Sequence, residues 1–185
     1  MEQWLKVVAG VLLVVVVAVY AWWYWPSGET LESPEVLAGQ ALSAAKTQDQ
    51  ELACARLVVV AGKLGKSGTR NPAREALLRV FKQSKTPTVQ GAALRGLASI
   101  WDYDSMGLLL DALGNDSVEV RAAAGQAVTS LLCQSREDFN PRAPPEQRKS
   151  QVQRLREQWK GFTTVGKGGL SRLDIWKETL AKRDQ

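Results

Sequence analysis

The sequence contains no histidine, the residue that most often serves as a general base or a metal ligand. It has only two cysteines, Cys54 and Cys133, which lie far apart and outside any CxxC spacing. This usage favours neither a zinc site nor a disulfide scaffold. Both cysteines fall at apolar positions of predicted helices, so we expect small buried side chains. One disulfide in an oxidising compartment is the alternative.

Signs of catalytic chemistry are equally scarce. Serines and threonines are scattered without a histidine base, and no glycine-rich phosphate loop follows a strand. The nearest approach to a reactive cluster is a group of carboxylates in one short stretch of the chain: Asp102, Asp104, Asp111, Asp116 and Glu119. Two of them flank Tyr103 in a predicted turn, and helix capping accounts for Asp116. We therefore expect no enzyme activity and no catalytic, cofactor-binding or metal-binding residues.

The first 26 residues hold a long apolar run, from Val7 to Trp25, in which 19 consecutive residues carry no charge. As a helix it is about 28 Å long, close to the thickness of a bilayer core, and its tryptophans suit the headgroup level. We expect residues 1–26 to form a transmembrane signal anchor that binds the lipid bilayer. The predicted span is marked by Val7, Leu12, Val16, Tyr20, Trp22, Trp23 and Trp25.

Charges around this run predict its orientation. Lys6 precedes it, whereas Glu29, Glu32 and Glu35 follow it and no Lys or Arg occurs until Lys46. The positive-inside rule then places the N-terminus in the cytoplasm and the body outside it, in the periplasm or the extracellular space. A signal peptide cleaved after Ala21 is the alternative, and it would also export the body.

Strand signals are nearly absent between Pro34 and Gln134, so we expect an all-α fold. Apolar residues at helical spacing predict three helix pairs in residues 27–137, with boundaries marked by Pro, Gly and Asn. The predicted first helices begin at Pro34, with Leu37, Ala41, Leu42 and Ala45 inward, at Pro72 and at Met106; the second helices cover 50–64, 89–101 and 118–133. Aligning the second helices places Leu52, Val89 and Val120 in one column, at spacings of 37 and 31 residues.

The segment NDSVEVRAAAGQAVTSL resembles the second-helix signature of HEAT-type repeats, through Asp116, Val120, Arg121, Ala124 and Leu131. The resemblance covers about 100 residues and is strong in one repeat, since Pro87 and Gln90 replace the Asp and Arg in the preceding one. It implies a short HEAT-like α-solenoid, in which the turn Asp caps the second helix and the Arg reaches a neighbouring turn. Some HEAT-like proteins are lyases or isomerases of bilin chromophores, which is an alternative function.

The remaining residues, 138–185, are expected to form a basic linker and C-terminal capping helices. A predicted helix over 146–158 presents Val152, Leu155 and Trp159, and another over 170–181 presents Leu173, Trp176 and Leu180 behind a partial capping box of Ser171 and Asp174. From Arg142 onward the chain has 11 Lys or Arg and 5 Asp or Glu, whereas residues 1–141 have 13 and 14. The basic excess of the protein therefore lies in this tail.

These features favour a membrane-anchored, non-catalytic interaction module that scaffolds an unknown protein partner. Nucleic acid is not expected as a partner, because the body is predicted to be exported. In a solenoid the second helices commonly line the binding face. The exposed polar positions on them lead us to expect a partner-binding face at Arg56, Arg95 and Gln126.

Overall fold

The computed structural model describes residues 31–65, 71–132, 138–165 and 169–183. The predicted anchor, with its span residues, and Cys133 lie outside this part of the chain. None of the helices among the described residues combines the length and the apolar character needed to cross a bilayer.

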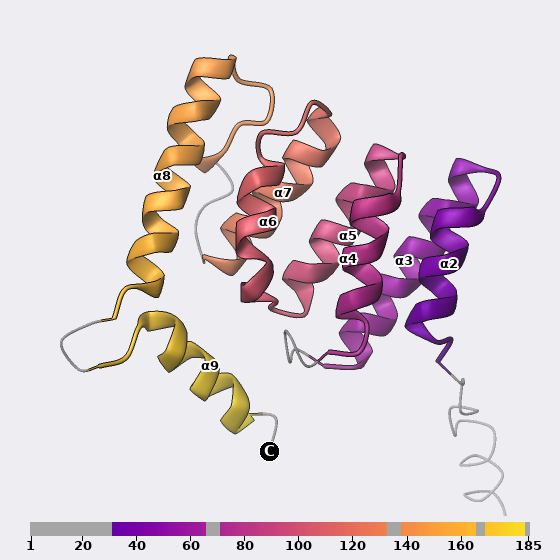
Figure 1. Cartoon of the computed structure of the whole chain (residues 1–185), viewed down its shortest axis with the longest axis horizontal. Helices are drawn as coiled ribbons and strands as arrows, with labels where there is room; N and C mark the ends of the chain where they lie inside the picture. Colours follow the sequence, from indigo (N-terminus) through magenta and orange to yellow (C-terminus); the bar gives the residue numbers. More distant parts are fainter. Residues whose placement is uncertain (1–30, 66–70, 133–137, 166–168, 184–185) are drawn as a thin grey trace, which may run out of the picture. The chain divides into compact units, whose positions relative to one another are not determined.

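The described residues form α-helices joined by short connections, without strands, which confirms the all-α prediction (Figure 1). Residues Glu32–Gln185 make up one compact unit, so the terminal helices belong with the preceding helix pairs. The elements are α2 (Pro34–Ser43), α3 (Thr47–Lys63), α4 (Arg74–Gln83), α5 (Pro87–Ser99), the 3₁₀ turn η2 (Tyr103–Ser105), α6 (Met106–Ala112), α7 (Val118–Leu131), α8 (Pro145–Thr163) and α9 (Arg172–Arg183).

The helices are arranged as successive pairs, α2 with α3, α4 with α5, and α6 with α7. The second helices also pack on one another in series, since α5 lies between α3 and α7 (Figure 1). Each pair therefore buries part of its apolar surface against the next pair, as the spacing of apolar residues predicts.

Local sequence signals fix several helix ends. The Ser33 hydroxyl accepts a hydrogen bond from the amide of Glu35, and Pro34 occupies the first helical position, where its missing N–H costs nothing. Helix α2 ends at Ser43, so Ala45, predicted to face inward on this helix, lies beyond its end and is exposed. Gly65 follows α3 with φ of +101°, the left-handed conformation expected of a glycine just past a helix end.

The end of α5 differs from the prediction. The helix stops at Ser99, and Trp101 adopts φ of +59°, which is unusual for a bulky residue. The Trp101 amide bonds to the carbonyl of Ala98 and the Asp102 amide to the carbonyl of Leu97, the two bonds of a Schellman motif. A tryptophan thus stands where most helices place a glycine.

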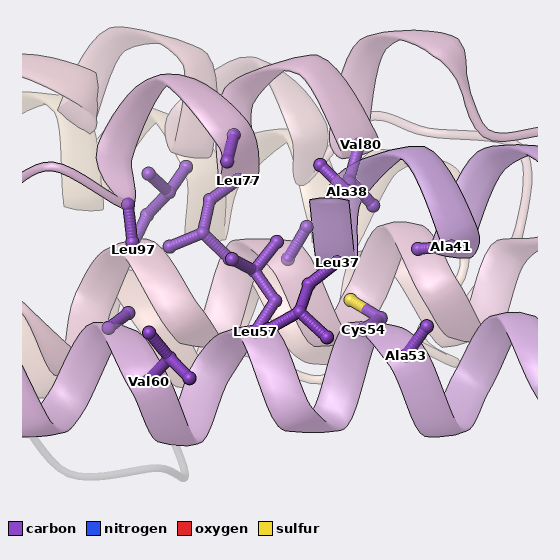
Figure 2. Packing of buried hydrophobic residues seen from close by; sticks show 14 of the residues in the cluster. Leu37, Ala38, Ala41, Ala53, Cys54, Leu57, Val60, Leu77, Val80 and Leu97 are labelled. Carbon is purple, nitrogen blue, oxygen red and sulfur yellow. The ribbon is translucent and has the colours of Figure 1, made fainter. Parts of the chain in front are cut away.

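Buried positions correct the predicted alignment of the first pair. Leu52 is 53% exposed, whereas Val89 and Val120 are fully buried, so the three do not share a column. The shared pattern is instead three buried residues at four-residue spacing on each second helix: Ala53, Leu57 and Ala61; Val89, Ala93 and Leu97; Val120, Ala124 and Val128. The spacings between helices are therefore 36 and 31 residues. Figure 2 shows Ala53, Leu57 and Leu97 in one core together with Leu37 of α2 and Leu77 of α4.

Small residues allow the second helices to approach each other closely. A Cβ atom on Gly91 of α5 would lie only 3.1 Å from the Cβ of Ala123 on α7. Any larger side chain at either position would push the two helices apart, because a packed core has no room to absorb it.

Helices α8 and α9 cover the last pair. Leu155 is buried, and Val152, Trp159, Leu173 and Trp176 pack against the same core as α6 and α7. These five contacts agree with the predicted inward faces of the terminal helices. The side chain of Leu180 is outside the described part of the structure.

Hydrogen bonds complete the predicted cap of α9. The Ser171 amide and hydroxyl both donate to Asp174 Oδ2, at 2.9 and 2.6 Å, and the Asp174 amide donates back to the Ser171 hydroxyl at 3.1 Å. This is a full capping box. These hydrogen bonds, first from the Ser171 side chain and then from its amide, hold the pKa of Asp174 below its usual range.

An aromatic cluster joins the terminal helices to the turn before α6. Tyr103 stacks on Trp159 and Phe162 of α8, with ring centroids 6.4 and 6.1 Å apart. Trp101 lies against Trp176 of α9 at 5.8 Å. Because aromatic pairs at these separations contribute beyond their buried area, the cluster fixes α8 and α9 on the last pair.

Candidate protein-binding surface

The corrected register decides which predicted surface residues are equivalent. Arg95 and Gln126 lie two residues after the second buried position of their helices, and both are exposed. The equivalent residue on α3 is Val59, which is 57% exposed. The row of equivalent positions therefore runs from an apolar side chain on α3 to polar side chains on α5 and α7.

Arg56, the third residue of the predicted face, is exposed on α3 but does not belong to this row. In the register of the buried residues, Arg56 corresponds to Ala92 and Ala123, the positions where a second helix packs on its neighbour. Arg56 is the large exception, and it stays exposed and lies 3.8 Å from the carboxylate of Glu32. Of the three residues predicted to face a partner, Arg95 and Gln126 are therefore the two at equivalent positions.

The surroundings of Arg95 include a buried thiol. Cys54 of α3 is fully buried and its sulfur donates to the carbonyl of Val89 at 3.6 Å. Burial raises the pKa of the Cys54 thiol to about 11, and the positive charge of Arg95 opposes that shift. A protonated, buried thiol is a weak nucleophile, so Cys54 acts as the small core residue that the sequence predicts. The alternative of a disulfide to Cys133 has no support at Cys54, which is free.

The signature residues of the third pair divide into core and anchor. Val120, Ala124 and Leu131 are buried in the core of α6 and α7. The predicted cap of α7 is wrong in one detail. The hydroxyl of Ser117, not the carboxylate of Asp116, accepts hydrogen bonds from the amides of Glu119 and Val120. Serine lies one position closer to the helix and so reaches the amides first.

Arg121 binds backbone carbonyls instead of a carboxylate. Its guanidinium donates to the carbonyls of Asn115 and Asp116, both at 2.7 Å, and to that of Pro141 at 3.0 Å. It therefore holds the turn before its own helix and the segment that leads to α8. This differs from the expected contact with a neighbouring turn Asp.

The same position is used in all three pairs. Gln50, Gln90 and Arg121 are each the fourth residue of a second helix, and each donates to the carbonyl six residues upstream, at 2.8, 2.8 and 2.7 Å. We call these three residues the loop anchors. Gln90 therefore makes the same kind of carbonyl contact as Arg121, although it is not an arginine. Helix α3 begins one turn earlier, relative to its three buried core residues, than α5 and α7 do. Its fourth residue, and therefore its loop anchor, is Gln50.

The five carboxylates of the middle region do not form one cluster. Asp102 is fully buried, its Oδ2 accepting from Arg74 Nε at 2.9 Å and from the Ser105 hydroxyl. Asp104 and Asp111 make exposed ion pairs, and the Ser117 hydroxyl lowers the pKa of Glu119 by hydrogen bonding. Four of the five carboxylates thus make separate contacts, and among the described residues no contact of the Asp116 carboxylate accompanies them. Within the described ranges, no three His, Cys, Asp or Glu side chains are grouped to hold a metal ion.

Part of the basic tail is engaged within the protein. Arg156 of α8 pairs with Asp111 of α6 at 2.7 Å, and Lys177 of α9 pairs with Asp104 at 3.1 Å. Arg154 and Lys160 are exposed and make no ion pair with any described residue. These two side chains are the cations of α8 that remain available to an acidic partner.

An open depression of about 720 Å³ lies where α8 ends and α9 begins. Phe162, Val165, Leu170 and Ile175 line it together with Gln158, whose buried Oε1 has no hydrogen-bond partner among the described residues. None of the predicted site residues lies here. One signal of it is present in the sequence, the apolar residues Val165 and Leu170 in a glycine-rich connection.

Comparison of the chain with protein-family models, curated proteins and solved structures finds no match.

Proposed function

We propose that the protein is a membrane-anchored, HEAT-like helical-repeat module that binds another protein and has no catalytic activity of its own. The observation that carries this proposal is the repeated construction of its three helix pairs. Equivalent core triplets and equivalent loop anchors recur in each pair. Stacked pairs of this kind create an extended surface for a macromolecular partner.

The exposed row on α5 and α7 is the binding surface in this proposal. Arg95 and Gln126 occupy equivalent positions and are exposed, and Arg95 forms no ion pair with any described residue. Side chains that the fold does not use are free to change without loss of stability, and so are free to serve recognition. Arg95 favours an acidic group on the partner, and Arg154 and Lys160 on α8 add a sequence-independent attraction that raises the association rate.

The membrane anchor in this proposal is the apolar run from Val7 to Trp25, and the body is exported, in keeping with the charges around that run. C-terminal helices α8 and α9 serve as the solenoid cap, because they cover the core of the last pair. A repeat array needs such a cover, since a terminal repeat otherwise leaves an apolar face open to water.

Site-specific photo-crosslinking in membranes tests the proposal. A photoreactive amino acid is placed at position 95 or 126 of the full chain, or at the control position Gln83 at the exposed end of α4. We expect the same discrete adduct from positions 95 and 126 and none from position 83. Arg95→Glu should suppress the adduct formed at position 126, whereas Lys82→Glu should leave it unchanged.

The fold itself must be intact for this comparison. Both charge reversals are at exposed positions, so the thermal midpoint should change little. Deleting α8 and α9 is not a useful variant, because Leu155 and its neighbours complete the core. If position 126 gives no adduct, or Arg95→Glu leaves the adduct unchanged, the proposed surface is wrong.

A further inference from the structure

Helix α3 has a second apolar surface, opposite to the residues that it buries. Leu52, Ala55, Val59 and Gly62 follow one another at spacings of three, four and three residues, so they share one face of the helix. We call this face the α3 stripe. All four residues are exposed, and the side chains of Leu52 and Val59 are 53% and 57% accessible.

The repeat itself does not require apolar residues on this face. Thr88 and Arg95 of α5, and Glu119 and Gln126 of α7, occupy the positions that correspond to Leu52 and Val59. Both later helices fold with polar side chains there. The apolar character of the α3 stripe therefore has to be explained by something other than packing within the stack.

Gly62 is a second feature of the α3 stripe that packing within the chain does not explain. It lies in the last turn of α3, and a Cβ atom built on it would meet nothing within 4 Å. Helical glycine is destabilising relative to alanine because it costs more backbone entropy. Neither crowding nor an unusual backbone conformation accounts for this glycine. Gly39 of α2 has equally open surroundings, and on the α3 stripe this open space at Gly62 would admit a second chain.

We propose that the α3 stripe pairs with the α3 stripe of a second copy of this chain, with the two helices antiparallel. A two-fold axis near residue 57 then places Leu52 opposite Gly62 of the second copy, and Val59 opposite Ala55. Each large side chain meets a small one. This alternation lets two helices pack closely without voids.

The charges along α3 also suit this orientation. Asp49 and Glu51 lie in its first turns, and Lys63 lies in its last turn. In an antiparallel pair the acidic end of each helix faces the basic end of the other, whereas a parallel pair would place like charges together. Arg56 falls near the axis, and Glu32 at 3.8 Å offsets its charge within each copy.

The contact is small, and this sets its expected strength. Helix α3 has 17 residues and is therefore about 26 Å long. A single helix pair of this length buries less than a typical stable interface, so the dimer is expected to be weak and concentration-dependent. It does not rest on the proposed partner surface, because Arg95 and Gln126 are outside the α3 stripe.

Light scattering of the full chain in mild detergent measures the association. Gly62→Leu fills the space that the second copy should occupy, and its Cβ atom meets no described residue of its own chain within 4 Å. Gly39→Leu on α2 is the matched control, because its Cβ would also meet nothing within 4 Å. We expect Gly62→Leu to raise the dimer dissociation constant at least tenfold and Gly39→Leu to leave it unchanged. A monomeric wild-type chain, or equal effects of the two substitutions, would overturn the proposal.

Disulfide crosslinking tests the orientation. Two differently tagged full chains, one with Ala55→Cys and one with Val59→Cys, are mixed in a Cys133→Ser background, with that background alone as a control. The antiparallel arrangement predicts the mixed 55–59 product in preference to either homodimer. Predominant 55–55 and 59–59 products would indicate parallel helices and would contradict the proposal.

Discussion

The first and last helix pairs of this protein leave their outer surfaces in different states. At the C-terminal side, α8 and α9 cover the core of the last pair through an aromatic cluster and two ion pairs. On the first pair, the α3 stripe keeps Leu52 and Val59 more than half exposed. One surface is thus closed by the chain itself, and the other is left for a neighbour. The difference shows that apolar residues at helical spacing identify a contact face without saying which molecule provides the contact.

The largest expected effect compares one substitution on the two surfaces. Leu155→Ala removes a buried side chain that joins α8 to the last pair, and it should lower the free energy of unfolding by about 2–5 kcal/mol. Leu52→Ala removes an exposed side chain and should cost less than about 0.5 kcal/mol. Urea unfolding of both variants measures the contrast. Similar losses would mean that the α3 stripe is already covered within the chain.

Substitutions of two aspartates near the surface that α8 and α9 cover should have effects of intermediate size on the free energy of unfolding. Asp102→Ala removes a fully buried carboxylate from Arg74, which retains Glu75 at 2.6 Å, so we expect a loss of about 2–3 kcal/mol. Asp104→Ala breaks only an exposed pair with Lys177 and should cost about 0–1 kcal/mol. Thermal unfolding at constant pH separates the two. If Asp104→Ala is the more damaging change, the covered surface depends on α9 more than on the Asp102 turn.

The smallest effect concerns the pH at which α9 stays in place. The pKa of Asp174 is lower in the folded protein than in an unfolded chain, because Ser171 donates hydrogen bonds to the carboxylate. This contribution is therefore complete above the ordinary pKa of an aspartate and is lost as the pH falls through the lowered one. Acid titration followed by tryptophan fluorescence should show α9 loosening in that range. Asp174→Asn should remove this component, and an unchanged titration would show that the capping box does not hold α9.

Several elements follow directly from the sequence because their signals are local. Ser33 with Pro34, Gly65, and Ser171 with Asp174 each mark a helix end through contacts within a few residues. The inward faces of α8 and α9 are also predicted, since most large apolar residues of each helix lie on one side. The paired order of the helices follows from the same spacing.

Three features could not be predicted in this way. Helix α3 is apolar on two faces, so periodicity alone cannot decide whether Leu52 or Ala53 is buried. Trp101 takes a backbone conformation that usually signals glycine, and its ring packs against Trp176, which is distant in the sequence. The carbonyl contacts of Arg121 depend on Pro141, which is 20 residues away.

The loop anchors have a consequence for how the chain tolerates length changes. Gln50, Gln90 and Arg121 each hold the carbonyl six residues upstream, so each connection between paired helices has its length fixed by one hydrogen-bonded side chain. An inserted residue would move that carbonyl away and leave it unpaired at a helix junction. Peptide tags, linkers or natural insertions therefore fit poorly inside the pairs. The anchors make these three connections fixed spacers, although surface loops in general accept added residues easily.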